Sequence, residues 1–169
     1  MSSGDRLWTP AYLAIGSNLS HPIRQLTAAL ELLRAASGVR VYAASSAYRS
    51  APLGGIEQPD FLNACVALLT RLSARELLRA LQAIEEKLGR DRNVRRWGPR
   101  IIDLDLLVFG RERLDEPDLT VPHPGIAARN FVLLPLREIV PDLQIPGLGR
   151  VSDLAVPAEP HIARVGDTL

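Results

Sequence analysis

The strongest signal in the chain is the segment WGPRIIDLDLLVF, which spans residues 97–109. Its second half is rich in Ile, Leu and Val and is followed by Gly110, a pattern that predicts a strand. Side chains alternate between the two faces of a strand, so Asp103 and Asp105 are expected to project from the same face. The other face carries an unbroken apolar row, made of Ile102, Leu104, Leu106 and Val108. The segment therefore predicts a strand with one acidic face and one core face.

Two carboxylates on one strand face repel each other and lose hydration unless a cation lies near them. Mg²⁺ takes oxygen ligands, and carboxylates at this spacing can hold one or two such ions. Five arginines lie just upstream of the strand: Arg90, Arg92, Arg95, Arg96 and Arg100. Carboxylates for metal beside guanidinium groups for phosphate are the components of a phosphoryl-transfer site. The alternative is a solvated strand face whose aspartates pair with these same arginines.

Length and composition indicate one globular domain. The chain has 169 residues, of which 47% are hydrophobic and 23% are charged, enough to build a core. The formal net charge of +1 excludes strong long-range attraction to nucleic acid or to an anionic membrane. Cys65 is the single cysteine, and the sequence shows neither a long apolar run nor a signal-peptide pattern. We expect a single domain over residues 1–169, cytoplasmic and monomeric, without a nucleic-acid or membrane partner.

Three further strands are predicted upstream of the acidic strand. Each is an apolar run bounded by turn residues, and they cover residues 11–15, 41–48 and 62–70. Gly16 and Asn18 follow the first strand, and both tolerate the positive φ of a tight turn. Only a loop separates the second strand from the third, which is the arrangement of an antiparallel pair.

Two helices are predicted between these strands. The first has Ser20 as its N-cap and ends near Gly38. Its apolar residues recur at helical spacing: Ile23, Leu26, Leu30 and Leu33. The second helix begins with a capping box formed by Ser73 and Glu76 and ends at Gly89. The chain therefore alternates between elements of helical and of strand periodicity.

The predicted order is β-α-β-β-α-β, the split βαβ pattern of the ferredoxin-like α+β fold. That fold is an antiparallel sheet with both helices on one face. The apolar row at residues 102–108 should face the helices, and Asp103 and Asp105 should lie on the open face, where a ligand reaches them. The core is expected over about residues 11–143, and residues 144–169 form an irregular C-terminal extension.

The region after the acidic strand holds other candidate site residues. A small hairpin is expected up to Thr120, and a short helix or irregular apolar segment after Arg129. His123 lies between two prolines that hold it stiffly, as either a pre-placed phosphate donor or an exposed loop residue. Trp97 and Phe131 either join the core or form a pocket that holds a flat heterocycle between two rings.

Five blocks of the sequence together resemble the 6-hydroxymethyl-7,8-dihydropterin pyrophosphokinase family of folate biosynthesis. The blocks are IGSN at 15–18, QPDFLN at 58–63, RWGPR at 96–100, DLD at 103–105 and LTVPH at 119–123. They stand in the same order as in the family, and the match runs from about Tyr12 to Leu143. The resemblance implies a monofunctional enzyme that transfers pyrophosphate from ATP to the hydroxymethyl group of the pterin. AMP leaves, and two Mg²⁺ ions assist.

The resemblance also assigns roles to residues of this sequence. The implied catalytic residues are Arg90, Arg92, Arg100, Asp103 and Asp105, and the metal ligands among them are Asp103 and Asp105. The implied ATP-binding residues are Gln82, Glu85, Arg92, Arg100, Leu106, His123 and Arg129. The implied pterin-binding residues are Ser50, Ala51, Leu53, Phe61, Asn63, Trp97, Asp103 and Phe131. Without the resemblance, the position of Glu85 at the border of the apolar stripe of its helix predicts a surface acid.

The sequence departs from the family pattern at a few positions. Ser50-Ala51 stands where many members have Thr-Pro, Phe61 where many have Tyr, and Pro124 where an aromatic residue is common. Phe61 lacks the hydroxyl of tyrosine, and Pro124 removes a ring that could stack on the nucleotide.

Two other functions fit part of the sequence. An RNA-binding ferredoxin-like module needs aromatic residues on the open sheet face and a basic surface. A two-metal nucleotidyl transferase shares the carboxylates but does not need the Trp97 and Phe131 rings. The predicted fourth strand offers aspartates and the net charge is near zero, which disfavours RNA binding, and the Trp97 and Phe131 rings favour a pyrophosphokinase, whose implied substrates are small molecules.

Overall fold

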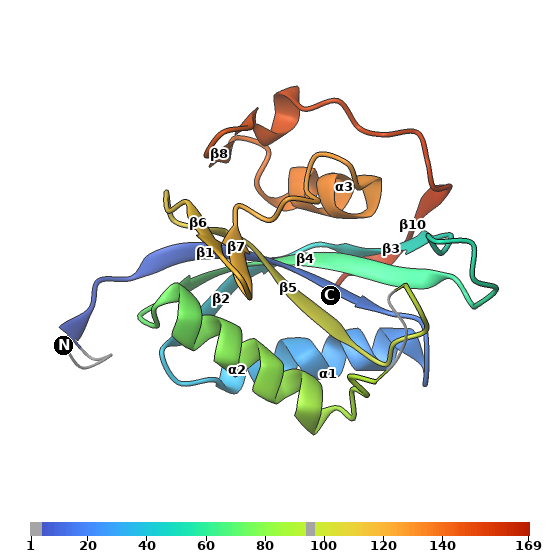
Figure 1. The fold of residues 1–169 in the computed structure, drawn as a ribbon, viewed down its shortest axis with the longest axis horizontal. Coiled ribbons are helices and arrows are strands. Elements are labelled where there is room, and N and C mark those ends of the chain that lie inside the picture. The colour runs from blue at the N-terminus through green and yellow to red at the C-terminus, as the bar shows by residue number, and fades with distance from the viewer. Residues whose placement is uncertain (1–4, 94–96) are drawn as a thin grey trace.

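The computed structural model describes residues 5–93 and 97–169 and has a mixed α/β fold built on one antiparallel sheet (Figure 1). The strand order is β10-β3-β4-β1-β5, and β2 pairs with β4 next to β3. The strands are β1 (Thr9–Ser17), β2 (Val39–Ala44), β3 (Ser46–Ser50), β4 (Phe61–Thr70), β5 (Asp103–Phe109) and β10 (Ile162–Thr168). Two small hairpins lie outside the sheet: β6 (Leu114–Glu116) with β7 (Leu119–Val121), and β8 (Gln144–Ile145) with β9 (Gly149–Arg150).

Helices cover both faces of the sheet. Helices α1 (Pro22–Ala35) and α2 (Ala74–Lys87) lie on one face, and α3 (Asn130–Ile139) lies on the other (Figure 1). A short 3₁₀ helix, η2 (Val151–Asp153), follows α3. The larger apolar cluster joins the sheet to α1 and α2, and a second cluster joins it to α3 and includes the buried Cys65. The hairpin expected up to Thr120 is confirmed, and of the two alternatives expected after Arg129 the helix is the one present. This helix, α3, covers part of the face that was expected to be open.

The two helix starts differ in how well the sequence predicts them. The capping box of α2 is confirmed, because the Ser73 hydroxyl accepts from the Glu76 amide and the Glu76 carboxylate accepts from the Ser73 amide. The Ser20 cap of α1 is wrong: His21 is the N-cap, and it makes no side-chain cap bond. Both Ser20 and His21 have positive φ, so the chain enters α1 through a left-handed turn. Ile23 is also 46% exposed, because it lies on the outer row of α1 with Thr27.

The strand predicted over residues 41–48 is divided at Ser45. Strands β2 and β3 pair with successive parts of β4, and the Ser45 hydroxyl accepts a hydrogen bond from the Cys65 amide at 2.9 Å. The same hydroxyl donates to the Ser46 carbonyl at 2.8 Å. The Ser45 hydroxyl thus replaces a backbone group in the pairing, which allows the chain to bend between β2 and β3. The spacing of apolar residues does not predict this break.

Strand β5 contains an extra residue that changes its alternation. Leu13 of β1 pairs with Leu106, and Tyr12 pairs with Val108, so Leu107 has no opposite residue. A bulge of one residue moves all later side chains to the other face. Val108 therefore packs with the α3 cluster, and the prediction that it faces α1 and α2 is wrong. Ile102, Leu104 and Leu106 precede the bulge and face α1 and α2 as predicted.

The C-terminal region is more regular than predicted. Strand β10 pairs antiparallel with β3, with Ile162 opposite Ser50, and forms an edge of the main sheet. The prediction of an irregular tail over residues 144–169 is therefore wrong for β10, and also for the β8–β9 hairpin and η2. Strand β10 follows a proline-rich segment, and its extended conformation depends on pairing with β3. Among the described residues, the structure contains no helix that is both long and apolar enough to cross a membrane.

Candidate functional site

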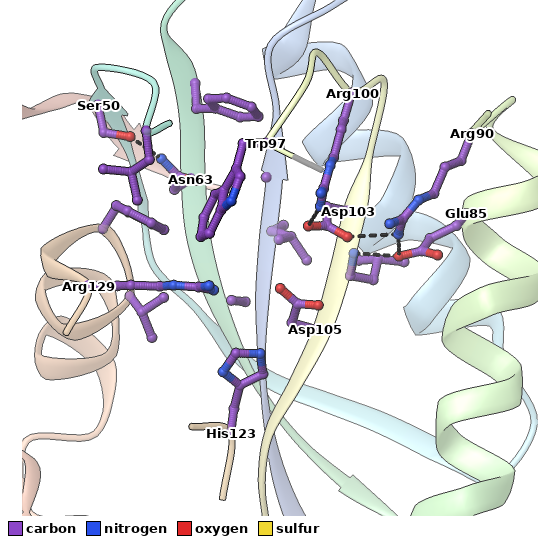
Figure 2. A pocket seen from close by; sticks show the side chains of 18 of the residues that line it. Ser50, Asn63, Glu85, Arg90, Trp97, Arg100, Asp103, Asp105, His123 and Arg129 are labelled. Carbon is purple, nitrogen blue, oxygen red and sulfur yellow. Dashed lines mark hydrogen bonds and ion pairs between the residues drawn. The ribbon is translucent and has the colours of Figure 1, made fainter. Parts of the chain in front are cut away.

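A cavity of about 580 Å³ lies between α2 and α3, across one end of β1 and β5 (Figure 2). This volume is typical of a small-molecule site. Its lining includes these residues predicted from the sequence: Ser50, Ala51, Leu53, Phe61, Asn63, Gln82, Glu85, Arg90, Arg92, Trp97, Arg100, Asp103, Asp105, His123, Arg129 and Phe131. The fold thus brings together residues that lie up to 81 positions apart, from Ser50 to Phe131.

Three predicted residues stand apart from this set. The Leu106 side chain is 5% exposed and packs in the core with α1 and α2, so any contact with a nucleotide would have to come from its backbone. Arg95 and Arg96 fall outside the described residues.

Asp103 is held between two arginines (Figure 2). Arg90 Nη1 lies 2.7 Å from Asp103 Oδ1, and Arg100 Nη1 lies 2.6 Å from Asp103 Oδ2. Arg90 also pairs with Glu85, whose Oε1 accepts from the Leu104 amide at 2.8 Å. Glu85 is only 4% exposed, and its burial raises the pKa of this carboxyl. Glu85 is therefore not a surface acid but the buried member of a partly exposed network of acids and arginines.

Asp105 has a different environment from Asp103. No residue in 5–93 or 97–169 donates a hydrogen bond to its carboxylate, and its nearest opposing charges are those of Arg129 and Arg100. Burial, and then repulsion by Asp103, raise the pKa of Asp105 to about 7. A partly buried carboxylate that accepts no hydrogen bond from the described residues is a favourable place for a cation.

The carboxylates of Asp103 and Asp105 suit a Mg²⁺ ion that is also bound by substrate phosphate. Mg²⁺ is commonly held by one or two carboxylates, with water and substrate phosphate oxygens completing its shell. Among the described residues, no group of three or more His, Cys, Asp and Glu side chains is arranged to hold a metal ion alone. Asp103 and Asp105 fit an ion that shares its coordination with a bound phosphate.

The opposite end of the cavity is aromatic. The Arg129 guanidinium carbon lies 5.6 Å from the centroid of the Trp97 ring and 6.0 Å from that of Phe131. Trp97 has a φ of 68°, and its carbonyl accepts from Gln58 Nε2 at 2.6 Å. A Cβ on Gly54 would lie 2.9 Å from the Trp97 Cβ, so glycine is needed there for the two loops to meet. Two rings and a guanidinium group form the walls of a site suited to a flat heterocycle.

Asn18 has a positioning role that the sequence reading missed. Its Nδ2 donates to Gln58 Oε1 and to the Pro59 carbonyl, each at 2.9 Å, and its Oδ1 accepts from the Arg100 amide at 2.8 Å. The residue joins the turn after β1 to the loops before β4 and β5. Neither Asn18 nor Gly16 has positive φ, so that prediction is wrong.

Gly16 and Ser50 set the position of Asn63. A Cβ on Gly16 would lie 3.0 Å from Asn63 Oδ1, so the missing side chain leaves room for this amide. Asn63 Nδ2 donates to the Ser50 hydroxyl at 2.7 Å. The amide is buried and held in place, and it lines the cavity beside Ser50 and near Trp97 (Figure 2).

His123 is held as a neutral imidazole. Its Nδ1 accepts from the Gly125 amide at 2.9 Å, which leaves the proton on Nε2. Burial first, and then the positive charge of Arg129, lower the pKa of His123, while Asp103 opposes this shift. The residue therefore offers an N–H donor and no charge near neutral pH.

This lowered pKa predicts a pH dependence of stability. The folded state resists protonation of His123, so its contribution to the free energy of unfolding is present above about pH 6.5 and is lost as the pH falls through the folded-state value. His123→Gln keeps a side-chain N–H donor and cannot titrate. We expect the variant to lose less stability than the parent protein between pH 7 and pH 5, measured by urea denaturation. Equal losses in both proteins would contradict the neutral assignment.

Comparison with known proteins points to one family. Residues 12–141 match the family model described as 7,8-dihydro-6-hydroxymethylpterin-pyrophosphokinase (HPPK). A Pseudomonas aeruginosa protein named 2-amino-4-hydroxy-6-hydroxymethyldihydropteridine pyrophosphokinase is 50% identical over 135 residues, which cover 80% of this chain and 83% of that protein. A Haemophilus influenzae protein of the same name is 44% identical over 144 residues, which cover 85% of this chain and 89% of that one.

A solved structure supports the fold independently. A Plasmodium falciparum HPPK-DHPS triple mutant superposes with a TM-score of 0.71 at 15% identity, covering 89% of this chain. The chain spans 43% of the length of that protein, and at this identity the likeness concerns the fold alone. The family model and the identities to the curated relatives are decisive: the chain belongs to the 7,8-dihydro-6-hydroxymethylpterin-pyrophosphokinase family.

Proposed function

We propose that this protein transfers pyrophosphate from ATP to the hydroxymethyl group of 6-hydroxymethyl-7,8-dihydropterin in folate biosynthesis. The observation that carries the proposal is that one cavity holds both halves of the required site. A pair of rings, Trp97 and Phe131, lines one end, and two carboxylates, Asp103 and Asp105, line the other. The names of the relatives describe the same reaction for those proteins.

The reaction places simple demands on these groups. The hydroxyl oxygen of the pterin attacks the β-phosphorus of ATP and its proton passes to solvent. The bond from that phosphorus to the α,β-bridging oxygen breaks, and AMP leaves with that oxygen. Asp103 and Asp105 would hold Mg²⁺, for which two ions are proposed, and the metal when bound neutralises charge on the phosphate oxygens. Arg90, Arg92 and Arg100 would stabilise the charge that develops during transfer.

The remaining residues would place the two substrates. Asn63 offers a fixed amide to the edge of the pterin, and the Trp97 and Phe131 rings offer stacking surfaces, once the Arg129 guanidinium yields the space beside them. Gln82 and Glu85 lie on the α2 side, where the nucleotide is proposed to bind. The neutral His123 donates from Nε2 to a phosphate oxygen. Movement of Arg90 and Arg92 over the phosphates would exclude water from the transfer.

The two alternatives are less well supported. An RNA-binding module would use an open sheet face, but α3 packs against β4 and β3 on that face. A nucleotidyl transferase would use the carboxylates and leave the ring-lined end of the cavity without a function.

The reaction product distinguishes these functions. With ATP, Mg²⁺ and the hydroxymethyl-dihydropterin, we expect AMP and the pterin diphosphate to form in equal amounts, resolved by anion-exchange chromatography. Omission of the pterin should abolish AMP formation, which is the control for simple ATP hydrolysis. ADP as the stoichiometric product would mean transfer of a single phosphoryl group and would overturn the proposal.

Several finer points are part of the same proposal. The strand order β5-β1-β4, with β2 and β3 both paired to the other side of β4, supports a ferredoxin-like sheet. In this sheet the second strand of the fold is divided into β2 and β3, and β10 adds a further strand beside β3. Two apolar clusters share that one sheet, which supports a single domain over residues 1–169. We also propose a cytoplasmic monomer that acts on small molecules, without nucleic-acid or membrane partners.

A further inference from the structure

The segment from Pro157 to His161 lies outside the part of the chain that matches the family model, which ends at residue 141. In the fold it passes along α3 and leads into β10 (Figure 1). No residue of this segment is part of the described cavity lining. It nevertheless makes direct hydrogen bonds to two separate walls of the cavity.

The first of these contacts is to Asn130, at the start of α3. Asn130 has no exposed surface, and its Nδ2 donates to the Pro160 carbonyl at 2.7 Å and to the Pro157 carbonyl at 3.2 Å. Its Oδ1 has no partner among the described residues, so the two donor bonds alone hold the amide in place. Asn130 stands in sequence between Arg129 and Phe131, which both line the cavity. The position of the amide therefore constrains both cavity residues.

The second contact is to the loop after β3. The His161 carbonyl accepts from the Ala51 amide at 3.1 Å, and the next residue, Ile162, is paired with Ser50. Ser50 in turn accepts from Asn63 at the cavity edge. The same short segment is thus bonded to the α3 wall and to the β3 wall of the ring-lined end.

We propose that Asn130 is a positioning residue for the pterin, and that residues 157–161 act as a brace that fixes the distance between the α3 and β3 walls. The inference rests on the proposed function, because it takes the ring-lined end as the pterin site. Residues that hold substrate-contacting groups in register change affinity through small displacements, even without touching the substrate. The brace touches neither Glu85 nor Asp103, and of the cavity residues beside it only Arg129 is assigned to the nucleotide. It should therefore act on the pterin more than on the nucleotide.

Asn130→Leu tests the proposal in the full chain, because leucine fills a similar volume and removes both donors. We expect the dissociation constant for 6-hydroxymethyl-7,8-dihydropterin to rise about tenfold. The measurement is titration calorimetry in the presence of Mg²⁺ and α,β-methylene-ATP, whose α,β bridge cannot be cleaved. The dissociation constant for this nucleotide analogue, measured without pterin, should change less than about threefold.

Glu138→Gln is the matched control. Glu138 anchors the other end of α3 to β3, where it accepts from the Ser46 hydroxyl at 2.8 Å and from the Tyr48 hydroxyl at 2.7 Å, and it does not line the described cavity. Loosening α3 there should lower thermal stability without raising the pterin dissociation constant. An equal loss of pterin affinity in both variants, or none in a folded Asn130→Leu protein, would overturn the proposal. A parent protein that fails to bind pterin would instead overturn the proposed function.

Hydrogen exchange in the parent protein keeps the test decisive if Asn130→Leu does not fold. Coupling is reciprocal, so a brace that supports pterin binding must itself be stabilised by bound pterin. We expect slower exchange at the Ala51 amide and in the peptide that contains residues 158–162 when the pterin joins the nucleotide complex. Protection that stops at the cavity lining would overturn the brace.

Discussion

Asp105→Asn is expected to lower turnover on the order of a thousandfold and at the same time to raise the stability of the ligand-free protein. The loss follows because asparagine keeps the size of aspartate and lacks the charge that a divalent ion requires. The gain follows from the raised pKa of Asp105, which is 3.8 ordinarily and about 7 in the folded protein. The ionised carboxyl is less favourable in the folded state than in the unfolded state. Stability is therefore lost as the pH rises through this window, and the asparagine variant avoids that loss.

Thermal unfolding without ligands measures the second effect. At pH 8, where Asp105 is ionised, the asparagine variant should unfold about 3 °C or more above the parent protein, and the difference should shrink as the pH falls toward 4. Asp103→Asn is the matched control. Asp103 is paired with Arg90 and Arg100, so its replacement should lower turnover and also lower stability. An Asp105→Asn protein that stays active at low Mg²⁺, or that is less stable at pH 8, would contradict this account of the site.

Arg92→Ala is expected to lower kcat about a hundredfold and to change the dissociation constants for ATP and pterin less than about threefold. Arg92 pairs with Glu86 at 2.9 Å, and both side chains are about half exposed or more, so this ion pair contributes little to stability. The unfolding temperature of the Arg92→Ala variant should match that of the parent protein. Stabilising charge only in the transition state affects turnover without affecting ground-state binding. Single-turnover kinetics beside equilibrium titration separates the two.

Arg90→Ala should show the same kinetic loss with an added loss of stability. Arg90 lies between Glu85 and Asp103, and its removal leaves two neighbouring carboxylates without their shared cation. Glu86→Gln is the control for Arg92, since it breaks the ion pair and keeps the guanidinium group; its kcat should be unchanged. If Arg92→Ala weakened substrate binding and left kcat unchanged, Arg92 would only bind the substrates in the ground state. That result would rule out a movement of Arg92 over the phosphates during transfer.

The sequence by itself determined much of the architecture and the chemistry of this protein. Local signals identify the capping box at Ser73, the β5 strand and its two aspartates, since each depends only on neighbouring residues. The resemblance to the family, carried by five blocks of sequence, indicated the cavity residues, which come from strands, loops and the helices α2 and α3. Residue type and order were sufficient for these features.

Only the tertiary structure decided the rest, because those features depend on partners far away along the chain. The bulge at Leu107 arises from pairing with β1, the division at Ser45 from pairing with β4, and the regularity of β10 from pairing with β3. The same holds for the chemistry of the site. Asp103 and Asp105 are two positions apart, yet Asp103 is held by two arginines, whereas Asp105 is partly buried and accepts no hydrogen bond from the described part of the chain. A sequence pattern predicts that two carboxylates share a face. It cannot distinguish their environments, since burial and charge around each one are set by α2, α3 and the loops that pack beside them.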